Sequence, residues 1–145
     1  MLTLKEYLVE YQKSHVHPTN ILIHKFCVPL IVFSIIGLLF SLPYTIGALK
    51  VVDIVCILAL VYYFILSKKY FFIMIPQLVL YYLICLAIQP TGQLFTISLI
   101  IFIISWIFQL YGHKVEGRKP SFLQDLTFLL IGPIWVVKKQ FKLKD

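Results

Sequence analysis

The chain has 145 residues, of which 61% are hydrophobic and only 13% are charged, and its mean hydropathy is +0.94. A soluble domain is about half apolar and about a quarter charged, because polar residues must cover its surface. The composition therefore excludes a soluble globular domain and a disordered chain, and the three Cys without CxxC spacing exclude a disulfide scaffold or a zinc finger. The net charge of +7 fits lysines beside anionic lipid better than nucleic acid, so we expect an all-α polytopic membrane protein with no nucleic-acid partner.

The N-terminal segment has the pattern of an amphipathic helix that lies on the membrane. Thr3 and Glu6 have the spacing of a capping box, and a helix over residues 4–15 would place Leu4, Leu8 and Tyr11 on one face. Pro18 suits the first turn of a following helix. We therefore expect an interfacial helix, then a bend at residues 14–18.

Two long stretches without charge predict the membrane spans. The stretch over residues 70–113 has 44 residues, too many for one crossing of about 20, and the turn-forming residues 89–93 divide it. The predicted transmembrane helices are residues 26–42, 51–67, 70–88 and 94–112. The span at 51–67 has the weakest support, because only 14 residues separate Asp53 from Lys68.

The C-terminal apolar segment differs from these spans. Residues 122–137 number only 16 and include Asp125, Gly132 and Pro133, a pattern typical of an interfacial or re-entrant segment. With four spans, twelve of the thirteen Lys and Arg residues share one side of the membrane and Lys50 alone lies opposite. We therefore expect one integral-membrane domain over residues 1–145, with both termini cytoplasmic, in a bacterial inner membrane or the endoplasmic reticulum.

All four histidines lie where the predicted spans meet the cytoplasmic face. His15, His17 and His24 precede or enter the first span, and His113 leaves the fourth. Glu116 follows His113 by three residues, one helical turn. Three imidazoles with a nearby carboxylate form a ligand set for iron, zinc or copper, so we interpret His15, His24 and His113 as a metal site.

Simpler interpretations remain for several of these side chains. His17 could hydrogen bond a carbonyl at the membrane surface, and Glu116 could form an ion pair with Arg118 or Lys119 in a solvated loop. Asp125 could cap the last segment. The aromatic side chains are interpreted as packing residues or as the aromatic belt of a membrane protein.

The chain contains two extended motifs, Tyr11-x-x-x-His15-x-x-Pro18-Thr-Asn20-x-x-x-His24-x-x-x-x-Pro29-Leu30 and Gln109-x-x-Gly112-His113-x-x-Glu116-Gly117-x-Lys119-Pro120. Together they resemble the membrane 2-hydroxy fatty acid dioxygenase family, which includes the α-oxidation enzyme of yeast phytosphingosine breakdown and bacterial relatives. The similarity covers nearly the whole chain. His17 stands where Asn is expected in many members, and Cys27 where Gly is common.

The resemblance implies an Fe(II)-dependent enzyme of fatty acid α-oxidation, which cleaves a long-chain 2-hydroxy fatty acid with O2 to the acid one carbon shorter. The essential histidines would be His15, His24 and His113. Glu116 would be a fourth ligand or would orient an imidazole. Three cationic residues could hold the substrate carboxylate at the headgroup level: Arg118, Lys119 and Lys25.

Three other functions are compatible with the sequence. A small b-type haem protein would use two of the histidines as axial ligands. A lipid-binding or transport protein without enzymatic activity would not need His24 or His113. A zinc hydrolase would work without oxygen.

Overall fold

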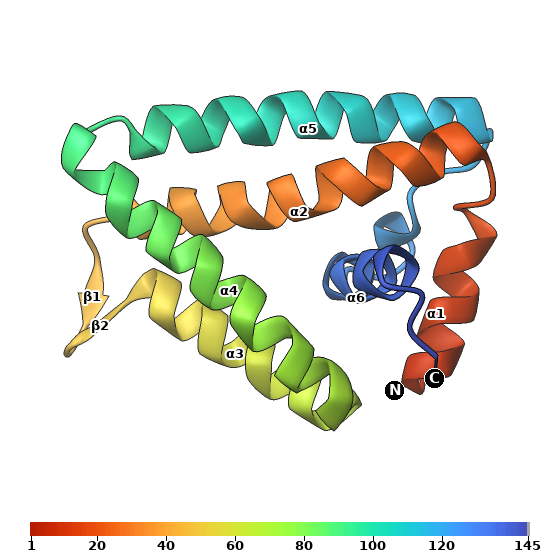
Figure 1. Cartoon of the computed structure of the whole chain (residues 1–145), viewed down its shortest axis with the longest axis horizontal. Coiled ribbons are helices and arrows are strands. Elements are labelled where there is room, and N and C mark those ends of the chain that lie inside the picture. The colour runs from red at the N-terminus through yellow and green to blue at the C-terminus, as the bar shows by residue number, and fades with distance from the viewer. Residues whose placement is uncertain (145) are drawn as a thin grey trace. The chain divides into compact units, whose positions relative to one another are not determined.

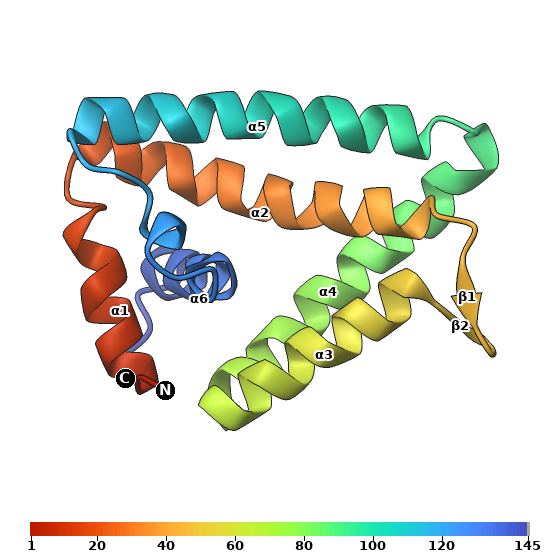
Figure 2. The same ribbon diagram turned by 180° about the vertical axis from the view of Figure 1, so that it is seen from behind.

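The computed structural model describes residues 1–144. Within this range the chain forms six α-helices, two 3-10 helices and one pair of very short strands (Figures 1 and 2). The elements in chain order are α1 (Leu4–Lys13), α2 (Pro18–Phe40), β1 (Thr45–Ile46), β2 (Leu49–Lys50), α3 (Val51–Leu66), α4 (Lys68–Ile88), η1 (Gln89–Thr91), α5 (Leu94–Glu116), η2 (Ser121–Leu123) and α6 (Phe128–Gln140). The chain divides into two compact units, Met1–Ile31 with Ile103–Asp145, and Val32–Phe102. The first unit contains the start of α2 and the end of α5, and the second contains the remainder of both helices.

Helix α1 starts and ends where the local sequence predicts. Thr3 Oγ1 accepts a hydrogen bond from the Glu6 backbone N–H at 3.3 Å, and the Glu6 carboxylate accepts one from the Thr3 N–H at 2.7 Å. The expected capping box is therefore confirmed. The expected bend is also confirmed, because α1 ends at Lys13 and α2 begins at Pro18.

Helix α6 packs against α1 in the first unit. Every residue from Ile131 to Val137 is buried, so the middle of α6 is covered on all sides. Gly132 allows a close approach of α1, because a Cβ at this position would lie 3.0 Å from the Tyr11 hydroxyl. The segment predicted at 122–137 thus becomes the short helix η2 and a 13-residue α6, which is too short for a full crossing.

The second unit contains the antiparallel helix pair α3 and α4. Its core joins α2, α3, α4 and α5 through six buried side chains: Phe33, Ile36, Phe40, Val52, Cys85 and Leu94. Residues 45–50 form an antiparallel hairpin that we had not expected in an all-helical chain. Its two-residue loop begins at Gly47, whose φ of 62° is a conformation that glycine adopts without steric cost.

Three helices are long and apolar enough to cross a membrane: Pro18–Phe40, Lys68–Thr91 and Leu94–Glu116. Helix α3 has 16 residues, or about 24 Å at 1.5 Å per residue, which is shorter than a hydrocarbon core of about 30 Å. The expected all-helical membrane protein is thus supported by three spans, and the fourth, at 51–67, is the one with the weakest sequence support. Helix α2 begins eight residues before the predicted span at 26–42, and α5 continues four residues past the predicted end at residue 112.

Candidate metal centre

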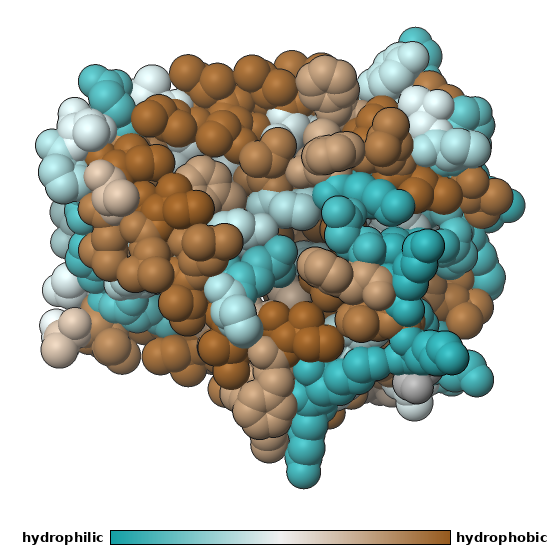
Figure 3. All heavy atoms as spheres, in the orientation of Figure 1, coloured by the Kyte–Doolittle hydropathy of each residue, from teal (hydrophilic) through white to brown (hydrophobic). Residues whose placement is uncertain are grey.

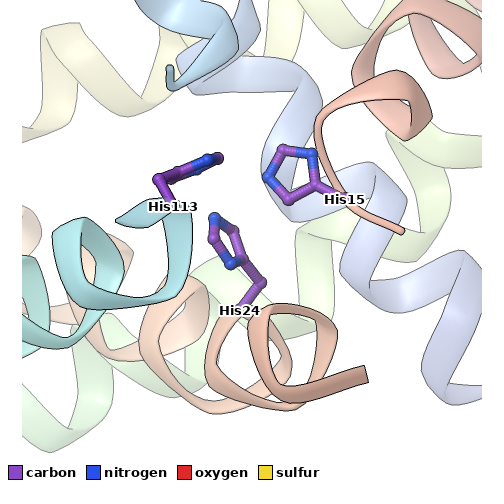
Figure 4. A group of neighbouring side chains, drawn as sticks. All are labelled: His15, His24 and His113. Atoms are coloured by element: carbon purple, nitrogen blue, oxygen red, sulfur yellow. The ribbon is translucent and has the colours of Figure 1, made fainter. Parts of the chain in front are cut away.

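Three of the four histidines meet in the first unit, at the junction of α1, α2 and α5 (Figure 4). His15 lies in the connection between α1 and α2, His24 in the second turn of α2, and His113 in the last turn of α5. One potential ligand atom from each lies within 4.8 Å of the other two. The ring centroids are 4.3 to 5.0 Å apart and the rings stand nearly perpendicular to one another. The fourth histidine, His17, is exposed and is not part of this group.

Hydrogen bonds fix the orientation of two of these rings. His15 Nδ1 lies 2.6 Å from the Tyr11 carbonyl oxygen, and His24 Nδ1 lies 2.8 Å from the Asn20 carbonyl oxygen. A carbonyl oxygen can only accept, so both rings donate through Nδ1 and keep the lone pair on Nε2. His15 Nε2 and His113 Nδ1 are buried and have no hydrogen-bond partner. Buried ring nitrogens without a partner, in a group whose potential ligand atoms converge, are what a metal site requires.

Aromatic rings enclose His15. The Tyr11 ring stacks on it with centroids 4.0 Å apart and nearly parallel planes, and the Trp135 ring lies 5.2 Å away. His15 is 1% exposed, so this wall leaves almost no access for bulk water to its ring.

Helices α2 and α5 approach closely beside the histidines because Gly112 has no side chain. A Cβ at position 112 would lie 2.5 Å from Asn20 Oδ1. Small residues at a helix interface let two backbones come together. Gly112 thereby allows His24 and His113, each next to this contact, to face one another.

Glu116 binds the backbone of the connection that carries His15. Its carboxylate accepts hydrogen bonds from the N–H groups of Val16 and His17, at 3.0 and 2.8 Å, and from Asn20 Nδ2 at 3.1 Å. Gln12 Nε2 donates to the His15 carbonyl at 2.5 Å, so the connection is held from both sides. Glu116 is not part of the group of converging ligand atoms. These contacts hold the connection that carries His15.

The expected carboxylate-binding residues fall in different places. Arg118 and Lys119 are exposed and line a pocket of about 270 Å³, which also includes Ser14, the neighbour of His15. Lys25 is half-buried on α2 and lines neither this pocket nor the larger one between α1 and α6. Asp125 accepts hydrogen bonds from the Thr127 N–H and hydroxyl in the turn before α6, whose N-cap is Thr127 and not Asp125.

Some supporting residues were not identified from the sequence. Trp135 was interpreted only as a packing or belt aromatic, yet its indole N–H donates to Gln12 Oε1 at 3.0 Å and its ring covers His15. Tyr11 precedes His15 by four residues and belongs to the first motif, so its spacing could have indicated that its ring contacts His15. Nothing in the sequence indicated the role of Gln12.

The three imidazoles fit a transition metal better than a haem. A tetrahedral site with ligand bonds of about 2.1 Å places its nitrogens about 3.4 Å apart, so the ligand atoms observed within 4.8 Å need only a small closing movement. A haem with two of these histidines as axial ligands would have to place its porphyrin between their rings. With ring centroids at most 5.0 Å apart, there is no room for it.

Helices apolar enough to span a membrane, together with a buried three-histidine group, are consistent with a membrane protein that has a candidate metal centre. Comparison with known families makes this more specific. The family model described as 2-hydroxy-palmitic acid dioxygenase Mpo1-like matches residues 1–142, so the chain belongs to the Mpo1-like family. No curated protein and no solved structure matches the chain significantly.

A first prediction concerns pH. Burial lowers the pKa of His15 from 6.5 to about 4, although the hydrogen bond to Tyr11 opposes the shift. Between these values the unfolded chain binds more protons at this position than the folded chain, so the free energy of unfolding should fall as pH drops from 6.5 toward 4. Thermal unfolding in detergent at about pH 7 and about pH 5 should show a smaller loss of stability in His15→Gln than in the wild type. His17→Gln, at an exposed histidine, should behave like the wild type, and equal losses in all three proteins would contradict the prediction.

A second prediction separates the two roles of Glu116. Glu116→Gln keeps one carbonyl acceptor but loses the charge, so we expect metal affinity to fall about 10- to 100-fold while the three-imidazole set remains. Amide hydrogen exchange at Val16 and His17 should accelerate, because their N–H groups donate to this carboxylate. If Glu116 ligates the metal instead, a metal-edge absorption spectrum will show one oxygen ligand fewer in the variant, and exchange at the two amides will be unchanged.

Proposed function

We propose that this protein is an Fe(II)-dependent dioxygenase that cleaves long-chain 2-hydroxy fatty acids to the acid one carbon shorter. The observation that carries the proposal is the buried group of His15, His24 and His113, in a chain whose family is described as 2-hydroxy-palmitic acid dioxygenase Mpo1-like. Imidazole ligands suit iron, and a metal with few protein ligands keeps positions open for substrate and O2.

The proposed reaction balances without an external reductant. The bond between the carboxyl carbon and the α-carbon breaks, the α-carbon becomes the new carboxyl group, and the old carboxyl leaves as CO2. One O2 accepts the electrons released. The products are the shortened acid, CO2 and one water, and together they contain both oxygen atoms of the O2. Iron would supply the O2 chemistry, as in other non-haem iron oxygenases.

Each group of residues has a proposed part in this reaction. His15, His24 and His113 would hold the metal through their inward nitrogens, and Glu116 would hold the connection that carries His15. Arg118 and Lys119 would bind the substrate carboxylate, because they line a pocket together with Ser14, next to His15. Lys25 is a weaker candidate because it is outside that pocket. Tyr11 and Trp135 would keep bulk water away from His15.

We further propose that the protein crosses the membrane four times with both termini in the cytoplasm, as one domain over residues 1–145. Three long apolar helices support three of the crossings, and α3 would be the fourth despite its 16 residues, since tilting or local thinning of the bilayer accommodates a short helix. The excess of Lys and Arg on one side supports the orientation. The metal centre would then lie at the cytoplasmic headgroup level, where the carboxylate of a long-chain acid resides.

The proposed function is tested by anaerobic purification, metal analysis, and incubation with 2-hydroxypalmitate, Fe(II) and O2. We expect one O2 consumed for each pentadecanoic acid formed, because both oxygen atoms appear in the products. His24→Ala and His113→Ala should each lose bound iron, and turnover should fall by roughly 100-fold or more, since losing a ligand exceeds the 10- to 100-fold cost of losing a residue that supports one.

His17→Ala is the matched control, because His17 is an exposed histidine close in sequence to the ligands and should retain iron and turnover. Bound iron without formation of the shortened acid would contradict the assigned reaction. Product formation without O2 would indicate a hydrolase, and full function in both alanine variants would indicate a lipid-binding or transport protein.

A further inference from the structure

A second pocket lies between α1 and the C-terminal end of α6, separate from the one that Arg118 and Lys119 line. Its volume is about 530 Å³, roughly twice that of the other. Leu8, Val9 and Leu143 give it an apolar lining, and Trp135, with only 2% of its surface exposed, also lines it. The pocket is therefore built on the packed contact between α1 and α6.

Four lysines surround this apolar lining: Lys5 from α1, Lys138 and Lys139 from α6, and Lys142 just after it. Within residues 1–144 no Asp or Glu lines the pocket, so its walls carry positive charge only. The Lys139 ammonium lies 5.6 Å from the centroid of the Trp135 ring, so this positive charge lies beside the aromatic ring that lines the pocket. Figure 3 shows hydrophilic side chains gathered over α1 and the end of α6, beside hydrophobic ones.

We propose that this pocket binds the headgroup of an anionic phospholipid, with the phosphate among the lysines and the first part of the acyl chains against the apolar lining. Charge complementarity favours an anion, and the apolar lining favours an amphiphile over a free ion. Anionic phospholipids are the anionic amphiphiles that the cytoplasmic leaflet holds beside a membrane protein, so a phosphate-containing lipid is the occupant that matches both features. The site is additional to the proposed catalytic function and does not depend on it.

Tryptophan fluorescence tests the site directly, because the chain has only two Trp residues. In a Trp106→Phe background, Trp135 is the sole reporter and lies in the pocket. The full-length protein in non-ionic detergent is titrated with dihexanoyl phosphatidylglycerol. We expect a saturable change with this lipid, and little change with dihexanoyl phosphatidylcholine, octanoate or inorganic phosphate.

Two double lysine variants test whether the change in Trp135 fluorescence reports binding in this pocket. Lys139→Gln with Lys142→Gln should weaken the apparent affinity for phosphatidylglycerol about tenfold or more, because each lysine near an anionic lipid contributes substantially to binding. The matched control, Lys68→Gln with Lys69→Gln, removes the same charge from two exposed lysines of α4 and should leave the affinity unchanged.

Native phosphatidylglycerol retained through purification from mixed micelles, measured by mass spectrometry, gives a second readout that needs no Trp substitution. It should be reduced in the pocket variant and not in the control. An equal response to phosphatidylcholine, a stronger response to octanoate or inorganic phosphate, or equal behaviour of the two double variants would overturn the proposal.

Discussion

The candidate site depends on the burial of three imidazole rings whose inward nitrogens face one another. His15 Nε2 and His113 Nδ1 have no hydrogen-bond partner, and a buried polar atom without a partner costs about 1–3 kcal/mol. Structural zinc in zinc-finger peptides contributes about 10 kcal/mol or more, and binding of that size would far exceed this cost. A cluster that is unfavourable without a ligand and favourable with one is the strongest physical argument for a metal centre in this chain.

The structure around the cluster serves to hold the His15 connection against two long helices. Gly112 lets α2 and α5 approach, and the Glu116 carboxylate binds the backbone of Val16 and His17. The Tyr11 and Asn20 carbonyls then set the ring orientations of His15 and His24. His15 and His24 are therefore fixed by hydrogen bonds as well as by packing, and α5 brings the distant His113 to them.

Much of this arrangement could be predicted because the signals are local. The capping box at Thr3 and the helix start at Pro18 depend on adjacent residues, and apolar length alone identifies the long helices. The convergence of His24 and His113 was expected because four predicted spans bring the start of the first and the end of the fourth to the same face of the membrane. The family assignment was also predicted from the two histidine motifs and is confirmed over residues 1–142.

Other features depend on contacts that no local pattern records. The role of Trp135 requires α6 to fold back against α1, and a 13-residue apolar helix gives no sequence signal for its partner. The span prediction started at Phe26 because Lys25 is charged, although a helix can extend beyond the hydrocarbon and does so here from Pro18. The same extension at the end of α5 carries His113 and Glu116 past the predicted span. The candidate ligands His24 and His113 thus lie on the helix ends that a hydropathy criterion removes.

X-ray absorption at the metal edge of the purified, metal-loaded protein tests the central claim most directly. We expect one metal ion per chain and the scattering pattern of three imidazole ligands, with two imidazoles remaining in a variant that lacks His15. A wild-type spectrum with a sulfur ligand, with fewer than three imidazoles, or unchanged by the loss of His15 would contradict the account.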